Sequence, residues 1–233
     1  MMINIWLAAK KRCQPFVYWT LSLLCGIISE FIFDVTGRRA SAVALNLEAQ
    51  KQEFLTICRS SIQREGLEDL IDWLCKADFF TAPASTKYHG GYAGGLCQHS
   101  IDVYQYAKKI SFLMPKEPSE ESLAIATLFH DLCKVNLYKV DKRNQKINGE
   151  WQEVPYYIID EKFHFGGHGS KSVFLIQQFM KLTTEEAAAI NCHMGFSDGS
   201  ATTVRDVSNA YQQFPLAWIT HVADEAATYL LER

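Results

Sequence analysis

Residues 124–134 read AIATLFHDLCK, an apolar stretch that closes on His130 and Asp131. A serine followed by two glutamates stands at 119–121, and this start predicts a helix that runs to near Cys133. His130 and Asp131 would then lie in its last turn. An ionisable pair at the end of an apolar face is costly to bury without compensation, and a divalent cation compensates by accepting imidazole and carboxylate ligands together. An exposed helix end is the alternative, because short motifs often match by chance.

Apolar residues on both sides of this stretch recur with the period of amphipathic helices. We expect helices over about Leu45 to Ile62, Gly66 to Trp73, Leu96 to Leu113, Ser170 to Lys181, Thr183 to His193 and Pro215 to Leu231. The segments 81–95 and 195–210 read as polar or small-residue loops. Between 137 and 159 the pattern is extended and contains Asn148-Gly149, which predicts a β-hairpin. The expected fold is therefore all-α with a small β-hairpin insertion.

The N-terminal part differs in composition from the rest of the chain. No residue from Cys13 to Ser29 is charged, Glu30 interrupts, and the basic residues 10–12 come immediately before. Residues 1–44 are predicted to be an extension with an apolar helix, and 45–233 to be the folded domain. Three interpretations of 13–33 compete: a single-pass membrane anchor, a signal segment that is either uncleaved or cleaved near 40–42, and a stretch outside the natural product. An anchor would leave the folded domain in the cytoplasm.

Charge and cysteine usage narrow the functional classes. The net charge of −3 gives no broad basic field, so we expect no general coating of nucleic acid, although a small anionic ligand suits the local lysines. The seven cysteines contain no Cys-x-x-Cys pair, which argues against a zinc finger and a disulfide scaffold. Buried free cysteines are typical of a reducing compartment. Nothing in the sequence indicates an oligomeric state.

Two further polar residues stand in apolar helices. His99 follows Gly94-Gly95-Leu96, and Asp224 lies in the run 216–224. Taken singly, His99 could be a hydrogen-bonded core histidine and Asp224 could pair with His221 on its own helix. Together with His130 and Asp131 they form an ordered set of imidazoles and carboxylates.

Three blocks carry a family resemblance: YHGGYAGGLCQH at 88–99, LFHDLCK at 128–134 and PLAWITHVAD at 215–224. They resemble the HD superfamily of metal-dependent phosphohydrolases over roughly residues 45–233. The first block looks like that of bacterial HD proteins related to the 3′-to-5′ exoribonuclease branch and of small phage-associated HD proteins. The resemblance implies an all-helical bundle and hydrolysis of a phosphomonoester or phosphodiester.

The resemblance also implies a metal centre. His168 and His193 match the additional ligands of binuclear HD phosphodiesterases, although each could instead be an ordinary helix-end residue. Two divalent ions, Mn, Fe, Mg or Zn, are the expected cofactors. The implied ligands are His99, His130, Asp131, His168, His193 and Asp224.

The mechanism that the resemblance implies is attack of a metal-activated hydroxide on phosphorus. Asp131 would bridge the ions and Lys134 would stabilise developing negative charge. His89 would touch the substrate. Lys139, Lys142 and Arg143, together with Lys146, would bind substrate phosphate over the site, unless these exposed charges only solubilise the hairpin. His164 reads as a surface residue.

The expected substrate is a phosphorylated small molecule or a short nucleic-acid 3′ end. The exoribonucleases of the family usually carry a further nucleic-acid-binding module, which the first 44 residues are too short to supply. Two other functions fit the same residues: a catalytically silent metal- or nucleotide-binding signalling module, and a di-iron oxygenase of the HD type.

Overall fold

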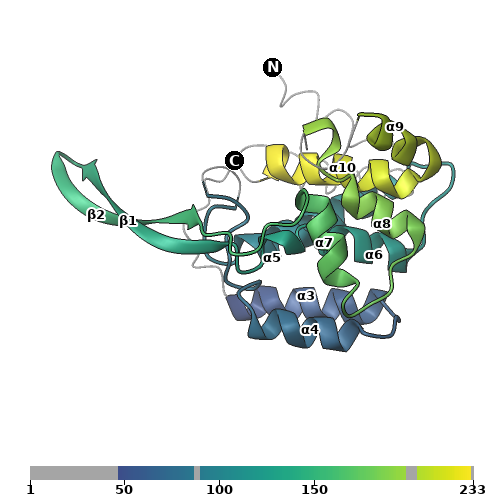
Figure 1. Cartoon of the computed structure of the whole chain (residues 1–233), viewed down its shortest axis with the longest axis horizontal. Helices are drawn as coiled ribbons and strands as arrows, with labels where there is room; N and C mark the ends of the chain where they lie inside the picture. Colours follow the sequence, from purple (N-terminus) through teal and green to yellow (C-terminus); the bar gives the residue numbers. More distant parts are fainter. Residues whose placement is uncertain (1–46, 87–89, 198–203, 232–233) are drawn as a thin grey trace, which may run out of the picture. The chain divides into compact units, whose positions relative to one another are not determined.

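The structure is a computed structural model that describes residues 47–86, 90–197 and 204–231, all within the unit Leu45–Arg233. This part of the chain holds eight α-helices and one two-stranded antiparallel sheet (Figure 1). The α-helices are α3 (Leu47–Ser61), α4 (Leu67–Lys76), α5 (Gly95–Ser111), α6 (Glu120–Leu128), α7 (His168–Ile176), α8 (Thr184–Asn191), α9 (Val204–Gln213) and α10 (Pro215–Ala226). Short helical turns follow at Leu132–Lys134 and Gly195–Ser197, and a π-helical turn at Ala227–Leu231.

The helices pack around one apolar core. α5 lies against α6 and α10, and α8 lies against α6, α7 and α10. Figure 1 shows α3 and α4 along one side of the bundle and α9 and α10 along the opposite side. The largest fully buried side chains of this core include Phe54, Phe79, Phe129, Leu96, Ile101 and Ile125. The predicted helical bundle is confirmed for this part of the chain.

The helix starts follow their local sequence signals. Ser119 caps α6 by accepting a hydrogen bond from the Ser122 backbone N–H at 3.0 Å. Thr183 and Glu186 form the predicted capping box of α8. Pro215 stands in the first turn of α10, where its missing N–H costs nothing.

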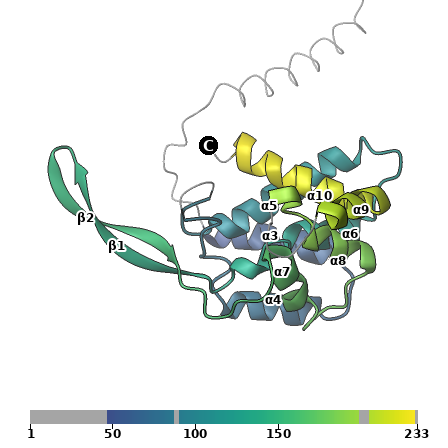
Figure 2. The same cartoon turned by 45° about the horizontal axis from the view of Figure 1, so that its top comes forward.

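The β-hairpin consists of β1 (Tyr138–Ile147) and β2 (Glu150–Ile159), paired antiparallel from Tyr138↔Ile159 to Ile147↔Glu150. Asn148 and Gly149 both adopt positive φ, 53° and 91°, as the two-residue turn requires. The predicted hairpin is confirmed. In Figures 1 and 2 it extends away from the helices, and most of its residues are exposed.

Two predictions about local structure are wrong. α6 ends at Leu128, so His130 and Asp131 lie in the turn after the helix rather than in its last turn. The predicted loop 195–210 instead contains the start of α9 at Val204. Residues 198–203 of that predicted loop lie outside the described ranges. α9 is polar in composition, but Val207 and Ala210 recur at helical spacing and are buried, which is sufficient to dock it.

The predicted membrane anchor needs a correction. No helix in the described part of the chain is long and apolar enough to cross a membrane, and this finding overturns the expected membrane-anchored localisation. The apolar run 13–33 lies outside the described residues. The division into an extension over 1–44 and a domain over 45–233 stays a prediction.

Candidate metal centre

Four of the predicted ligands meet inside the bundle. His99 comes from α5, Asp224 from α10, and His130 and Asp131 from the turn after α6. The Nε2 atom of His99 lies 3.2 Å from Nε2 of His130 and 3.1 Å from Oδ1 of Asp224. The Oδ2 atom of Asp131 lies 3.3 Å from His130 Nε2 and 3.7 Å from His99 Nε2. Three of the four residues are buried, and the side chain of Asp224 is 14% exposed.

The local sequence explains why a polar pair points inward. Leu128, Phe129 and Leu132 are all fully buried, so the turn that they enclose cannot reach the surface. The chain leaves α6 at Phe129 and re-forms a short helical turn at Leu132–Lys134. His130 and Asp131 are thereby held in the interior by the apolar residues on each side.

His193 joins the same cluster from the other side. It lies two residues beyond the end of α8, is fully buried, and its Nε2 atom is 3.5 Å from Asp131 Oδ1. Within the described part of the chain, that nitrogen makes no hydrogen bond. A buried nitrogen without a hydrogen bond is costly, unless it is a ligand of something that binds there.

Backbone carbonyls fix the orientation of two imidazole rings. The Nδ1 atom of His130 lies 2.7 Å from the Thr127 carbonyl oxygen, and Nδ1 of His193 lies 2.7 Å from that of Ile190. Because a carbonyl only accepts hydrogen bonds, Nδ1 carries the proton in both rings, and each Nε2 turns its lone pair or second proton toward the cluster. This hydrogen bond is the usual support of a metal-bound histidine.

The donor atoms fit a divalent ion. With metal–ligand distances of about 2.0 to 2.2 Å, neighbouring ligand atoms lie roughly 3.0 to 3.5 Å apart, which is close to the spacings observed here. Two triads have all their donor atoms within 4.8 Å of one another: His99, His130 and Asp131; and His130, His193 and Asp224.

The carboxylates of the cluster are charged. Burial by itself would raise the pKa of Asp131, but Lys134, whose Nζ lies 2.6 Å from Oδ2, and His130 hold it well below its usual range. Burial is likewise outweighed at Asp224, where the hydrogen bond from His99 and the neighbouring imidazoles lower the pKa. The centre therefore offers two ionised carboxylates beside three imidazoles.

His168 lies at the edge of this cluster. It is the first residue of α7 and is exposed, and its Nδ1 atom lies 3.5 Å from Cys133 Sγ. Cys133 Sγ in turn lies 3.8 Å from Asp131 Oδ1, which forms a third triad of possible donors. Gly169 permits this placement, because a Cβ atom there would come within 2.4 Å of the Asn191 carbonyl oxygen at the end of α8. The sequence analysis missed Cys133; its position two residues after Asp131 was the available signal.

The structure does not bring the predicted substrate-binding residues of the hairpin to the cluster. His89 lies outside the described residues. Lys139, Lys142 and Arg143 stand on the projecting hairpin; Lys142 Nζ pairs with Glu153 at 2.7 Å, and Arg143 lies over the Tyr156 ring. His164 is exposed, as expected, and its Nδ1 atom lies 3.2 Å from Glu161.

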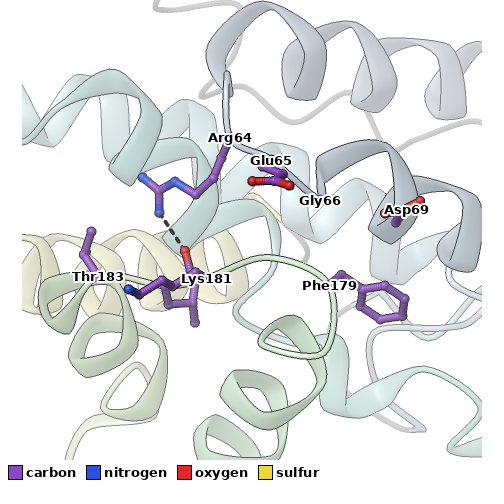
Figure 3. A pocket seen from close by; sticks show the side chains of 8 residues that line it. Arg64, Glu65, Gly66, Asp69, Phe179, Lys181 and Thr183 are labelled. Atoms are coloured by element: carbon purple, nitrogen blue, oxygen red, sulfur yellow. Dashed lines mark hydrogen bonds between the residues drawn. The ribbon is translucent and has the colours of Figure 1, made fainter.

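A cavity of about 670 Å³ lies apart from the candidate centre (Figure 3). Arg64, Glu65, Asp69, Phe179 and Lys181 are among its lining residues, and none of the predicted metal ligands is. Figure 3 shows the Arg64 guanidinium turned toward the Lys181 carbonyl oxygen, and the same group also pairs with Glu121 and Glu186. These contacts give Arg64 a structural role, because its guanidinium links Lys181, Glu121 and Glu186.

The comparison with protein families now gives the class. The model of the HD domain matches residues 96–229, more than half of the chain, and this range contains all six predicted metal ligands. The chain belongs to the HD domain family. This family is part of a superfamily of metal-dependent phosphohydrolases. The comparisons with curated proteins and with solved structures gave no match.

Proposed function

We propose that this protein is a metal-dependent phosphohydrolase that cleaves a phosphomonoester or phosphodiester in a nucleotide or at a nucleic-acid 3′ end. The observation that carries the proposal is the two-sided environment of Asp131. Its Oδ2 atom faces His99 and His130, while its Oδ1 atom faces His193 and Cys133. A carboxylate in this position can be shared by two ions.

The proposed ligands are those of the sequence analysis: His99, His130, Asp131, His168, His193 and Asp224. When bound, divalent ions supply positive charge for phosphate oxygens and activate water for attack on phosphorus. Imidazole and carboxylate ligands accept Mn, Fe, Mg or Zn, so the donor set alone leaves the metal open.

The other contributions come from the chain itself. The carbonyls of Thr127 and Ile190 keep the rings of His130 and His193 oriented before substrate arrives, which lowers the reorganisation needed during reaction. Lys134 holds a buried ammonium beside Asp131, where it can stabilise negative charge that develops on the reacting phosphate. His168, exposed at the edge of the cluster, marks the side from which substrate enters.

The proposed substrate class rests on charge and on the hairpin. The net charge of −3 favours a small ligand over a long polyanion. Arg143 and Thr86 both line a cavity of about 550 Å³ at the hairpin. Thr86 precedes His89 by three positions in the sequence. We propose that His89, Lys139, Lys142 and Arg143 bind substrate from this side. Kinship with the exoribonuclease branch is part of the same proposal.

The test is hydrolysis of a panel of mono- and diesters by the full chain loaded in separate assays with Mn²⁺ and with Zn²⁺, beside Asp131→Asn. We expect phosphate or nucleotide release by the wild type and a loss of at least about 10³-fold in kcat/KM in the variant, since one ligand and a shared charge are removed. Asp69→Asn, in the cavity of Figure 3, is the matched control and should keep full activity.

Two results would contradict the proposal. Two bound ions with no turnover of any ester would favour a silent metal- or nucleotide-binding module. Oxygen consumption by the iron-loaded protein, with no phosphate released in the absence of air, would favour a di-iron oxygenase.

A further inference from the structure

Cys133 is a third donor beside Asp131 and His168. It is 3% exposed, and its Sγ atom lies 3.5 Å from His168 Nδ1 and 3.8 Å from Asp131 Oδ1. The three donor atoms all lie within 4.8 Å of one another. The thiol is therefore placed where one ion could contact it together with an imidazole and a carboxylate.

Ser172 links the backbones of Cys133 and His168 through hydrogen bonds. Its hydroxyl accepts a hydrogen bond from the Cys133 backbone N–H at 3.1 Å and donates one to the His168 carbonyl oxygen at 3.1 Å. Ser172 is fully buried, so these bonds are not exchanged with water. The turn that carries Cys133 and the start of α7 are thus held in a fixed relation before any ion binds.

The two distances from the Cys133 sulfur are close to those that a thiolate ligand of zinc would have to its neighbouring ligand atoms. With zinc–sulfur at about 2.3 Å and zinc–nitrogen or zinc–oxygen at about 2.0 to 2.2 Å, a sulfur lies about 3.6 Å from each neighbouring ligand atom. The two sulfur distances observed here differ from that value by no more than about 0.2 Å. Both distances from the Cys133 sulfur are therefore of the size that a bound ion requires.

We propose that Cys133 is a metal ligand and that, with Asp131 and His168, it makes the outer half of the centre a thiolate site for a thiophilic ion. The inference rests on the proposed function, which requires a second ion near Asp131. Binding converts the Cys133 thiol to a thiolate, and the proton is released to solvent on the exposed His168 side. A thiolate favours zinc or iron over magnesium or manganese, so the two halves of the centre differ in metal preference.

The competing explanation is a thiol that donates a weak hydrogen bond to Asp131 and takes no part in binding. Titration of the full chain with Co²⁺ distinguishes the two, because a cobalt-bound thiolate gives an intense near-ultraviolet charge-transfer band that imidazole and carboxylate ligands do not give. We expect the wild type to bind two cobalt ions and to show the charge-transfer band. In Cys133→Ser the band should be lost, and the affinity for the second ion should be weakened at least about 10-fold. Cys58→Ser, at another buried cysteine, should keep both.

Other outcomes separate this inference from the proposed function. Two bound cobalt ions without a charge-transfer band in the wild type would overturn the role of Cys133 and leave the phosphohydrolase proposal standing. Failure of the wild type to bind any ion would overturn both. If Cys133→Ser does not fold, X-ray absorption of the zinc-loaded wild type decides: a sulfur neighbour at about 2.3 Å supports the inference, and a shell of nitrogen and oxygen alone refutes it.

Discussion

Lys134 is a buried cation beside the shared carboxylate. Its Nζ atom lies 2.6 Å from Asp131 Oδ2, and the residue is 9% exposed. Burial by itself would lower the pKa of Lys134, but the Asp131 carboxylate outweighs burial and raises that pKa, so the ammonium stays charged. The charge is thus available next to the place where a phosphate would react.

Lys134→Met should separate catalysis from metal binding. Because Lys134 is not among the ligands, we expect metal affinity within about a factor of ten of the wild type, while kcat falls about 10²-fold through the lost charge. Calorimetric metal titration and steady-state kinetics measure the two quantities. Lys171→Met is the matched control, since Lys171 is also a buried lysine in an ion pair, with Glu161, and is expected to keep kcat. Loss of metal binding in Lys134→Met would instead show that the lysine organises the centre.

At the scale of single residues, the sequence predicts which ionisable side chains gather inside the bundle better than it predicts the groups that surround them. His99, His130, Asp131, His193 and Asp224 can be found because ionisable residues are rare in apolar helices and so stand out. The carbonyls that orient the imidazole rings have no sequence signature, since every residue carries one. Cys133 was overlooked because a buried cysteine in an apolar run is ordinarily a core residue.

The helix α8 connects the site to the rest of the bundle through its first turn. Glu186, the capping-box glutamate, is buried and accepts hydrogen bonds from Arg64 in the α3–α4 turn and from Ser122 in α6. The far end of α8 leads to His193. The start of the helix is therefore fixed to two other elements, and the position of His193 depends on it.

Glu186→Gln should weaken the fold and reduce its sensitivity to acid. Burial by itself would raise the pKa of Glu186, but the hydrogen bonds from Arg64, the Thr183 backbone and Ser122 lower it. A lowered pKa gives stability that is present above the ordinary glutamate range and is lost as the pH falls through the folded-state value. We expect a loss of about 1 to 3 kcal/mol at pH 7 and a flatter decline of the unfolding free energy below about pH 5. Urea unfolding across this range measures both effects.

Glu185→Gln serves as the control, because Glu185 stands in the same first turn of α8 but is not the capping-box glutamate. It should unfold with nearly the wild-type pH dependence. If the two variants decline in parallel as the pH falls, Glu186 is not the source of the acid sensitivity.

At the scale of elements, the helices and strands predicted from strong local sequence signals are confirmed, whereas an element with only a weak signal was missed. The Asn148-Gly149 turn and the Thr183–Glu186 box are stereochemical signals that act over a few residues, and both elements form as predicted. α9 was missed because two buried residues in a polar stretch are a weak signal, and its docking depends on contacts with α10. The early end of α6 likewise follows from tertiary packing around Phe129.

The candidate centre joins parts of the chain that are distant in sequence. Its residues come from α5, from the turn after α6, from the end of α8 and from α10, which span positions 99 to 224. Bound ions would cross-link these elements, and the unfolded chain has no such preformed set of ligands. Metal binding should therefore stabilise the whole folded domain.

Metal addition should raise the melting temperature of the full chain. At a free ion concentration 100 times Kd, linkage gives about 2.7 kcal/mol, which corresponds to a rise in Tm of roughly 5 to 10 °C for a domain of this size. Differential scanning calorimetry of the chelated and the Zn²⁺- or Mn²⁺-loaded protein measures the shift. Asp224→Asn should lose most of it, whereas Asp69→Asn, outside the centre, should show the wild-type shift. An equal rise in Asp224→Asn would mean that the ions stabilise the protein from another site, and the centre would then have to be sought elsewhere.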